Sequence, residues 1–301
     1  MSKRGASERK RVVAPLMSLP FFPSDSDPGP SFTELLRRTR FAGAQIPPGR
    51  VSEVVSAAGR QTPGFAVAPI SGVTHGTTVV ALRYDNGVVV AGDRRATEGN
   101  MIAHRSIEKV FPADRHSAVA IAGAAGSASE MVRLFQTQLE HYEKVEGTCL
   151  SLEGKANQLG QMVSANLQMA MQGLVVIPLF AGYDLRLKRG RIFTYDVTGG
   201  RFEETDFHAT GSGGRDAKNT VKLGYRERLG RDEAVELAVT ALYEAADEDT
   251  ATGGPDPVRG IYPVVATVDA EGYRRLEDTE VAERFRNVLE RRRERADGGA
   301  S

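Results

Sequence analysis

Cysteine is nearly absent from this sequence, since Cys149 is the one cysteine among 301 residues. A single cysteine excludes the framework of intramolecular disulfide bonds on which many small secreted domains depend. It is typical of a protein kept in a reducing compartment, and we expect a cytoplasmic location. We interpret Cys149 itself as an ordinary small apolar side chain.

Further absences narrow the class of protein. No apolar run is long enough to span a bilayer, and the basic N-terminus lacks the apolar region of a secretory signal. The 39 basic residues equal the 39 acidic ones, so the net charge points to neither a nucleic acid nor a membrane as a partner. The five histidines show no metal-ligand spacing, and we predict no metal site and no cofactor.

The residues that are present divide unevenly along the chain. Residues 1–76 hold nine of the 14 prolines and carry 10 Lys and Arg against 5 Asp and Glu, whereas residues 77–301 carry 29 against 34. Prolines and turn-forming pairs interrupt the first segment too often for a packed domain. We therefore expect a largely irregular leader over 1–76, with short helical pieces at 31–40 and 52–58.

After residue 77 the pattern is that of a packed domain. Two strands, 78–84 and 88–92, flank Asp85-Asn86-Gly87, which is a strong hairpin signal. Further strands are predicted over 109–111, 118–122, 174–184, 191–196, 207–210 and 262–269. Apolar residues at helical spacing predict helices over 127–145, 152–171, 216–225, 233–247 and 279–295.

The order of these elements predicts the fold class. Helices arrive in pairs between hairpin-like strands, whereas a doubly wound parallel sheet needs strict alternation of strand and helix. The order suits two mainly antiparallel sheets stacked face to face, with a helical layer on each outer side. We predict an α+β fold, a four-layer αββα sandwich.

The junction Gly76-Thr77, at the boundary between leader and body, carries the first chemical signal. If the chain is cut there, Thr77 gains a free α-amino group beside its own hydroxyl, so one residue holds both a nucleophile and a base. An ordinary α-amino group has a pKa of about 7.7–8.0, close to the value that suits a general base at neutral pH. Gly76 has no side chain to hinder an attack by Thr77 on the carbonyl that precedes it.

Several segments match one family in register. They are 77–109 with Gly92-Asp93-Arg94-Arg95, the strand end 121–123, the turn 211–213 and the run 249–260 with Thr252-Gly253-Gly254-Pro255. Together they resemble a proteasome β-subunit of the actinobacterial 20S type, over residues 77 to about 290. The resemblance implies an N-terminal nucleophile hydrolase fold and a threonine endopeptidase. It also implies a propeptide over 1–76, removed by autocatalysis, and a mature catalytic domain over 77–301.

The resemblance assigns a role to each matching residue. Lys109 would be a buried ammonium that favours the Thr77 alkoxide and lowers the pKa of the amine, and Asp93 would be its counter-charge. The backbone N–H of Gly123 would stabilise the oxyanion. The residues expected to orient the amino terminus and hold a water are Ser212, Asp249 and Thr252.

The resemblance also implies a substrate site. An extended peptide would pair as an added strand with Thr97, Gly123 and Ala125. The residues expected to line the first side-chain pocket are small or apolar: Ala96, Ile107, Phe111, Ile121, Ala125 and Ser129. With no charge at its base, the pocket would favour apolar residues at P1.

The expected partners come from the same family. They are proteasome α-subunits, six further copies of the chain in a homo-heptameric β ring of an α7β7β7α7 particle, and an ATPase ring that delivers modifier-tagged proteins. Two alternatives stay open. One is the β-like peptidase of the simpler bacterial ATP-dependent protease, which shares the Thr-Thr start but usually lacks so long a leader. The other is an inactive structural ring subunit, against which Thr77, Asp93 and Lys109 together argue.

Overall fold

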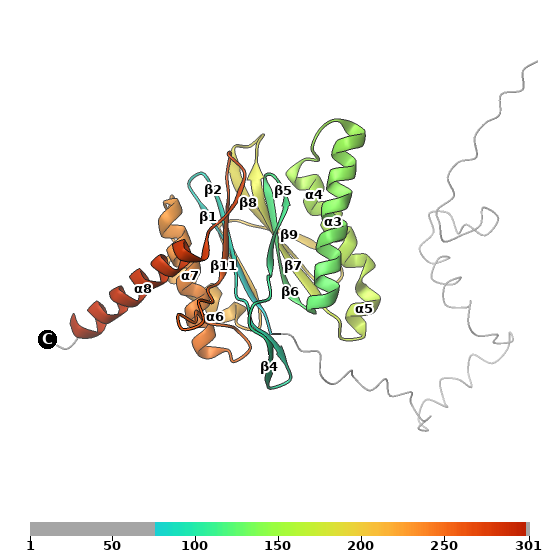
Figure 1. The fold of residues 1–301 in the computed structure, drawn as a ribbon. Coiled ribbons are helices and arrows are strands. Elements are labelled where there is room, and N and C mark those ends of the chain that lie inside the picture. The colour runs from blue at the N-terminus through green and yellow to red at the C-terminus, as the bar shows by residue number, and fades with distance from the viewer. Residues whose placement is uncertain (1–75, 299–301) are drawn as a thin grey trace, which may run out of the picture. The chain divides into compact units, whose positions relative to one another are not determined.

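A computed structural model of the chain describes residues 76–298, with side chains through residue 294 (Figure 1). The two short helices predicted at 31–40 and 52–58 lie outside the described residues. Two five-stranded sheets and a short two-stranded hairpin make up the strands of the described part. None of the helices described is long and apolar enough to cross a membrane.

The first sheet has the strand order β10-β1-β2-β11-β12, and every neighbouring pair is antiparallel. Its centre is the predicted hairpin, in which β1 and β2 meet at the Asp85-Asn86 turn. The bounds of its strands in chain order are β1 Thr78–Tyr84, β2 Gly87–Gly92, β10 Phe207–Gly211, β11 Val264–Val268 and β12 Tyr273–Arg275.

The second sheet is also fully antiparallel, in the simple order β5-β6-β7-β8-β9. Its strands are β5 Val110–Asp114, β6 Ser117–Gly123, β7 Val176–Asp184, β8 Arg189–Tyr195 and β9 Arg201–Glu204. The two-stranded hairpin of β3 (Ala96–Glu98) and β4 (Met101–His104) projects beyond one end of the sheets (Figure 1).

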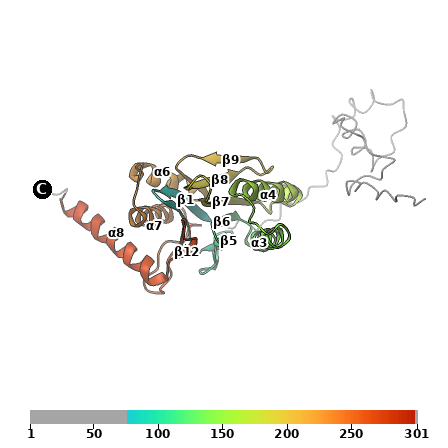
Figure 2. The ribbon, with the colours of Figure 1, turned by 90° about the horizontal axis from the view of Figure 1, so that it is seen from above.

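Helices cover the outer face of each sheet, as both views show (Figures 1 and 2). On the first sheet lie α6 (Gly214–Gly224) and α7 (Arg231–Glu248), with α8 (Asp278–Gly298) extending outward beside α7. On the second sheet lie α3 (Ala125–Glu146), α4 (Leu152–Ala165) and α5 (Leu167–Met171). The layers are therefore helix, sheet, sheet, helix, and the predicted αββα sandwich is confirmed.

The alternating directions of the side chains along β1 explain how one strand contributes to two apolar layers. Val79 and Ala81 belong to the cluster between the sheets, whereas Val80 and Leu82 pack with α6 and α7, and all four are fully buried. Successive side chains of a strand point to opposite faces, so a strand with helices on one side and a sheet on the other is apolar throughout. This places the start of β1, and Thr77 just before it, at the end of a rigid central strand.

The structure corrects several details of the predicted elements. The helix predicted over 152–171 is two helices, because Asn166 leaves the helical path at φ −85° and ψ 3° and caps both. Asparagine is a weak helix former, and none of the α5 residues is buried against the sheet. Lys109 lies one residue before β5 instead of within it. The strands that sequence analysis missed are β3, β4, β9 and β12.

Candidate active site

The loop after β10 holds Thr77 at the start of β1. The backbone N–H of Ser212 donates a hydrogen bond of 2.8 Å to the carbonyl oxygen of Thr77, and Thr77 is only 4% exposed. Gly211 has a φ of +104°, and a Cβ on it would come within 1.7 Å of the same oxygen. Glycine at 211 is therefore required both by its backbone conformation and by the close approach of Thr77.

Asp93, directly after β2, is a fully buried carboxylate with four hydrogen-bond donors around it. Its Oδ1 accepts from the backbone N–H of Thr78 at 2.8 Å and from Nζ of Lys109 at 2.6 Å. Its Oδ2 accepts from the backbone N–H groups of Arg95 and Gly253, at 2.9 and 2.8 Å. Four donors offset the cost of removing the charge from water. They also join the segment of Asp93 to three other parts of the chain, at residues 78, 109 and 253.

Lys109 forms a buried ion pair with Asp93, and the lysine side chain is 5% exposed. Its Nζ donates to Asp93, to the carbonyl oxygen of Arg95 at 2.5 Å and to the carbonyl oxygen of Gly76 at 3.3 Å. Burial lowers the pKa of Lys109, and the charge and hydrogen bond of Asp93 oppose that effect. The ammonium thus reaches the carbonyl that precedes Thr77, which belongs to the predicted cleavage bond.

A second network of hydroxyl groups fixes the same end of β1 from the other side. The Thr78 hydroxyl lies 2.6 Å from the Thr252 hydroxyl and accepts a hydrogen bond of 2.9 Å from the backbone N–H of Gly213. Thr252 in turn donates to Oδ2 of Asp249 at 2.6 Å. Sequence analysis named Ser212, Asp249 and Thr252 but missed Thr78, whose side chain joins them to the strand.

Asp249 stays charged more easily than an isolated aspartate. Burial alone would raise its pKa, but hydrogen bonds from Ser212, Thr252 and the backbone of Ala251, with the nearby charge of Arg95, hold the pKa below its ordinary value. A charged carboxylate accepts hydrogen bonds only, so it fixes the direction in which the Thr252 hydroxyl points. Asp249 is therefore suited to orient hydroxyl groups near Thr77.

The residues predicted for the first side-chain pocket gather with Thr77 and Lys109 around one cavity. All of them line it, namely Ala96, Ile107, Phe111, Ile121, Ala125 and Ser129, and so does Gly123, which was predicted to pair with the substrate. Glu108 and Ala128 also line it and were not predicted. Thr97, which was also predicted to pair with the substrate, accepts a hydrogen bond of 3.2 Å from the backbone N–H of Gly76.

Gly123 stands at the end of β6 where the chain turns into α3. Its φ is +120°, and a Cβ there would lie 2.0 Å from the carbonyl oxygen of Val175. Only glycine fits this conformation and this contact, so the strand end approaches the cavity with bare backbone. The role of its N–H as the oxyanion donor stays a prediction.

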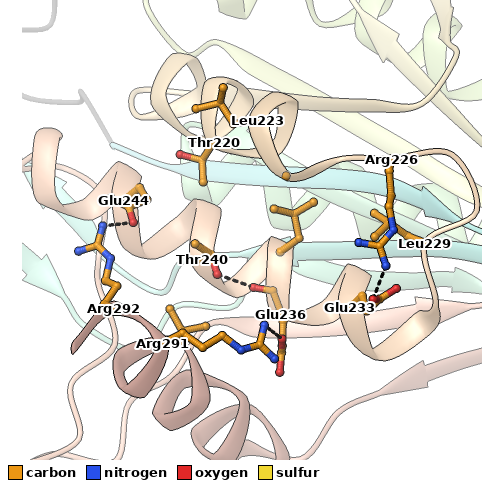
Figure 3. Close-up of a pocket in the computed structure, with 13 residues that line it drawn as sticks. Thr220, Leu223, Arg226, Leu229, Glu233, Glu236, Thr240, Glu244, Arg291 and Arg292 are labelled. Carbon is orange, nitrogen blue, oxygen red and sulfur yellow. Dashed lines mark hydrogen bonds and ion pairs between the residues drawn. The ribbon is translucent and has the colours of Figure 1, made fainter. Parts of the chain in front are cut away.

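A separate and larger cavity lies between α6, α7 and α8 and contains none of the predicted site residues (Figure 3). Its walls carry three ion pairs, Arg226–Glu233, Arg291–Glu236 and Arg292–Glu244. Paired charges of both signs leave no converging unpaired group that could act on a substrate. We therefore place the candidate active site at Thr77.

Comparison with known proteins agrees with this geometry. A family model described as "Proteasome subunit" matches residues 73–258, which include Thr77, Asp93, Lys109 and the loop of Thr252. The chain belongs to the proteasome subunit family. It is 60% identical to "Proteasome subunit beta" of Acidimicrobium ferrooxidans over 267 residues, which cover 89% of this chain and 92% of the relative.

Two further relatives named "Proteasome subunit beta" give the same result. The one from Streptomyces griseus is 59% identical over 77% of this chain and 84% of its own length. The one from Acidothermus cellulolyticus is 60% identical over 73% and 78%, respectively. The proteasome subunit described here is thus of the actinobacterial β type, and its family supports a core peptidase of the threonine class.

Proposed function

We propose that the chain is the threonine endopeptidase subunit of a 20S proteasome core, made as an inactive precursor and activated by self-cleavage between Gly76 and Thr77. One observation carries the proposal most strongly. The buried Lys109, held by Asp93, donates a hydrogen bond to the carbonyl oxygen of Gly76, and Thr77 and Lys109 line the same cavity. The division into a propeptide over 1–76 and a catalytic domain over 77–301 follows from this proposal.

In the self-cleavage step, the Thr77 hydroxyl attacks the carbonyl carbon of Gly76. Negative charge then develops on the oxygen to which Lys109 already donates at 3.3 Å. The C–N bond of the junction breaks as the nitrogen takes up a proton, which leaves an ester between Gly76 and the Thr77 oxygen. Water hydrolyses the ester, so the leader departs with a carboxylate and Thr77 keeps a free amine and a free hydroxyl.

Once the amine is free, it serves as the general base for the Thr77 hydroxyl on peptide substrates. The Lys109 ammonium lowers the pKa of the amine because like charges disfavour each other, which keeps a larger fraction neutral near pH 7. The Gly123 N–H takes the oxyanion, and removal of one such donor typically costs about 2.7–4 kcal/mol of transition-state stabilisation. Ser212, Asp249 and Thr252 hold the amino terminus in place.

Substrate peptides lie as an added strand against Thr97, Gly123 and Ala125. In the uncleaved chain, Gly76 is the last residue of the leader, and its N–H already donates a hydrogen bond to the Thr97 hydroxyl. The cavity is lined by Ile107, Phe111 and Ile121, so the proposed preference is for apolar P1 residues. Glu108 also lines it, and its carboxylate pairs with Arg275, which reduces its effect on an apolar side chain.

The proposed setting is a proteasome core with α-subunits, in which heptameric β rings face an enclosed chamber in the cytoplasm. A partner ATPase ring would deliver modifier-tagged, unfolded proteins to it. The β-type relatives favour this setting over the simpler bacterial protease. The charge pair beside Thr77 favours an active subunit over a purely structural one.

Co-expression with an α-subunit, followed by hydrolysis assays on the purified particle, tests the proposal. We expect the particle to cleave short peptides with an apolar P1 residue, and a Thr77→Ala particle to lose that activity to background. Thr137→Ala is the matched control, because Thr137 is an exposed residue of α3 outside the cavity. Full hydrolysis by Thr77→Ala particles, or none by unaltered particles that have lost the leader, would contradict the proposal.

A further inference from the structure

Three arginines line a small cavity beside the candidate active site. Arg94 and Arg95 come from the segment between β2 and β3, and Arg105 follows β4. The opposite wall is the segment between α7 and β11, from which the lining residues are Gly253, Gly254, Asp256, Ile261, Tyr262 and Pro263. The cavity thus gathers three cations from two parts of the chain against a largely neutral wall.

The positive charge of this cavity is only partly balanced. Arg94 pairs with Asp278 through one terminal nitrogen at 2.8 Å, while its Nε is buried and has no hydrogen-bond partner. Arg95 donates to the neutral carbonyl oxygen of Thr250 at 2.9 Å, and its charge lies near the carboxylate of Asp249. Arg105 makes no hydrogen bond or ion pair to any residue among 76–294.

The one carboxylate in the wall is already engaged. Asp256 accepts from the guanidinium of Arg259 at 2.6 Å and from the Arg259 backbone N–H at 3.1 Å. The backbone N–H of Gly254, by contrast, donates to no described residue. One guanidinium group without a described partner, a second with an unsatisfied Nε and a backbone amide with no described acceptor are donors that can bind a phosphate or a carboxylate.

We propose that Arg94, Arg95 and Arg105 form a binding site for a single small oxyanion, a phosphate or a carboxylate. The volume of the cavity is about 30 Å³, which gives room for one small ion. The site adjoins the catalytic charge pair. The Arg95 carbonyl oxygen accepts from Lys109, and the Gly253 amide donates to Asp93. Anion binding itself does not depend on the proposed peptidase activity.

Titration of the full-length chain with inorganic phosphate tests the site by thermal unfolding. A ligand that binds the folded state raises the melting temperature in a saturable manner. Ionic strength is held constant with sodium chloride, and sodium acetate is titrated in parallel. Arg105→Gln removes one charged donor at an exposed position and should weaken phosphate binding by about tenfold or more. Arg133→Gln, in an exposed residue of α3, is the matched control and should bind as the unaltered chain does.

The acetate arm identifies the chemistry of the ligand. Saturation by phosphate alone supports a site for a tetrahedral anion, and saturation by both supports a site that also takes a carboxylate, such as an acidic side chain. A melting temperature that rises no more with phosphate or acetate than with chloride would overturn the proposal. So would equal phosphate affinity of the Arg105→Gln, Arg133→Gln and unaltered chains.

Discussion

Replacing Asp93 with asparagine removes the charge that holds Lys109, and the structure indicates how large the effect should be. The carboxylate is fully buried, the lysine side chain is 5% exposed, and their atoms lie 2.6 Å apart. Asparagine has nearly the same shape, but its NH2 group must face either Lys109 and Thr78 or Arg95 and Gly253. All four of these groups are donors in the native site, so one pair of hydrogen bonds is lost in either orientation.

The expected cost in free energy of unfolding is about 3–5 kcal/mol, the range for removing one partner of a buried ion pair. Lys109→Met should cost a similar amount, since it leaves the Asp93 charge without its cation. The double variant leaves neither charge unpaired. Its cost should therefore fall short of the sum of the two single costs by about 1–3 kcal/mol, as is typical of residues in direct contact.

Urea unfolding of the full-length chain, followed by far-ultraviolet circular dichroism, measures these costs. The chain has no tryptophan, so tryptophan fluorescence cannot report the transition. Glu108→Gln is the matched control, because Glu108 pairs with Arg275 over the same 2.6 Å but both side chains are more than 40% exposed. It should cost less than about 1 kcal/mol. An Asp93→Asn cost no larger than that of the control would refute the reasoning.

Three further predictions concern the surroundings of Thr77. Thr78→Val leaves the buried Gly213 amide without an acceptor and should lower the free energy of unfolding in urea by about 1–3 kcal/mol. Thr78→Ser keeps the acceptor hydroxyl and should retain most of that free energy. Gly76→Ala should slow loss of the leader on a gel time course, because its Cβ would lie 2.0 Å from that of Ala251. Ala251→Gly should restore only part of the rate, since the backbone Cα and carbonyl oxygen of residue 251 would still lie 2.8 Å from the added Cβ. An unchanged rate in Gly76→Ala would contradict the steric argument. Asp249→Asn should reduce the amount by which the free energy of unfolding falls as the pH is lowered into the acid range. The lowered pKa of Asp249 means that its contribution is complete above its ordinary value of 3.8 and is lost as the pH falls through the lower folded-state value. An unchanged acid unfolding curve would contradict this assignment.

Local sequence signals were enough to predict most of the fold. The hairpin of β1 and β2 follows from alternating β-branched residues around Asp85-Asn86-Gly87, and the long helices follow from their apolar spacing. The short strands β9 and β12 were missed because edge strands of three or four residues, largely exposed, carry no alternating pattern. The break at Asn166 was missed because the apolar spacing continues through it.

The candidate site was predictable only in part. Asp93 and Lys109 are ordinary charged residues by local sequence, and such residues are usually solvated, so the family resemblance alone singled them out. Thr78 was missed because its contacts reach residues 213 and 252, which only the folded sheets bring near β1. The arginine cavity was missed for the same reason, since it joins residues 94, 105 and 253.

The chemical N-terminus of the chain in particles assembled with an α-subunit tests the central claim most directly. Intact mass and N-terminal sequencing should find a chain that begins at Thr77 with a free amine, and the Thr77→Ala chain should keep its full leader. A Thr77→Ala chain that still loses residues 1–76 would contradict cleavage by the Thr77 hydroxyl. A mature N-terminus at any residue other than Thr77 would contradict the account of the active site.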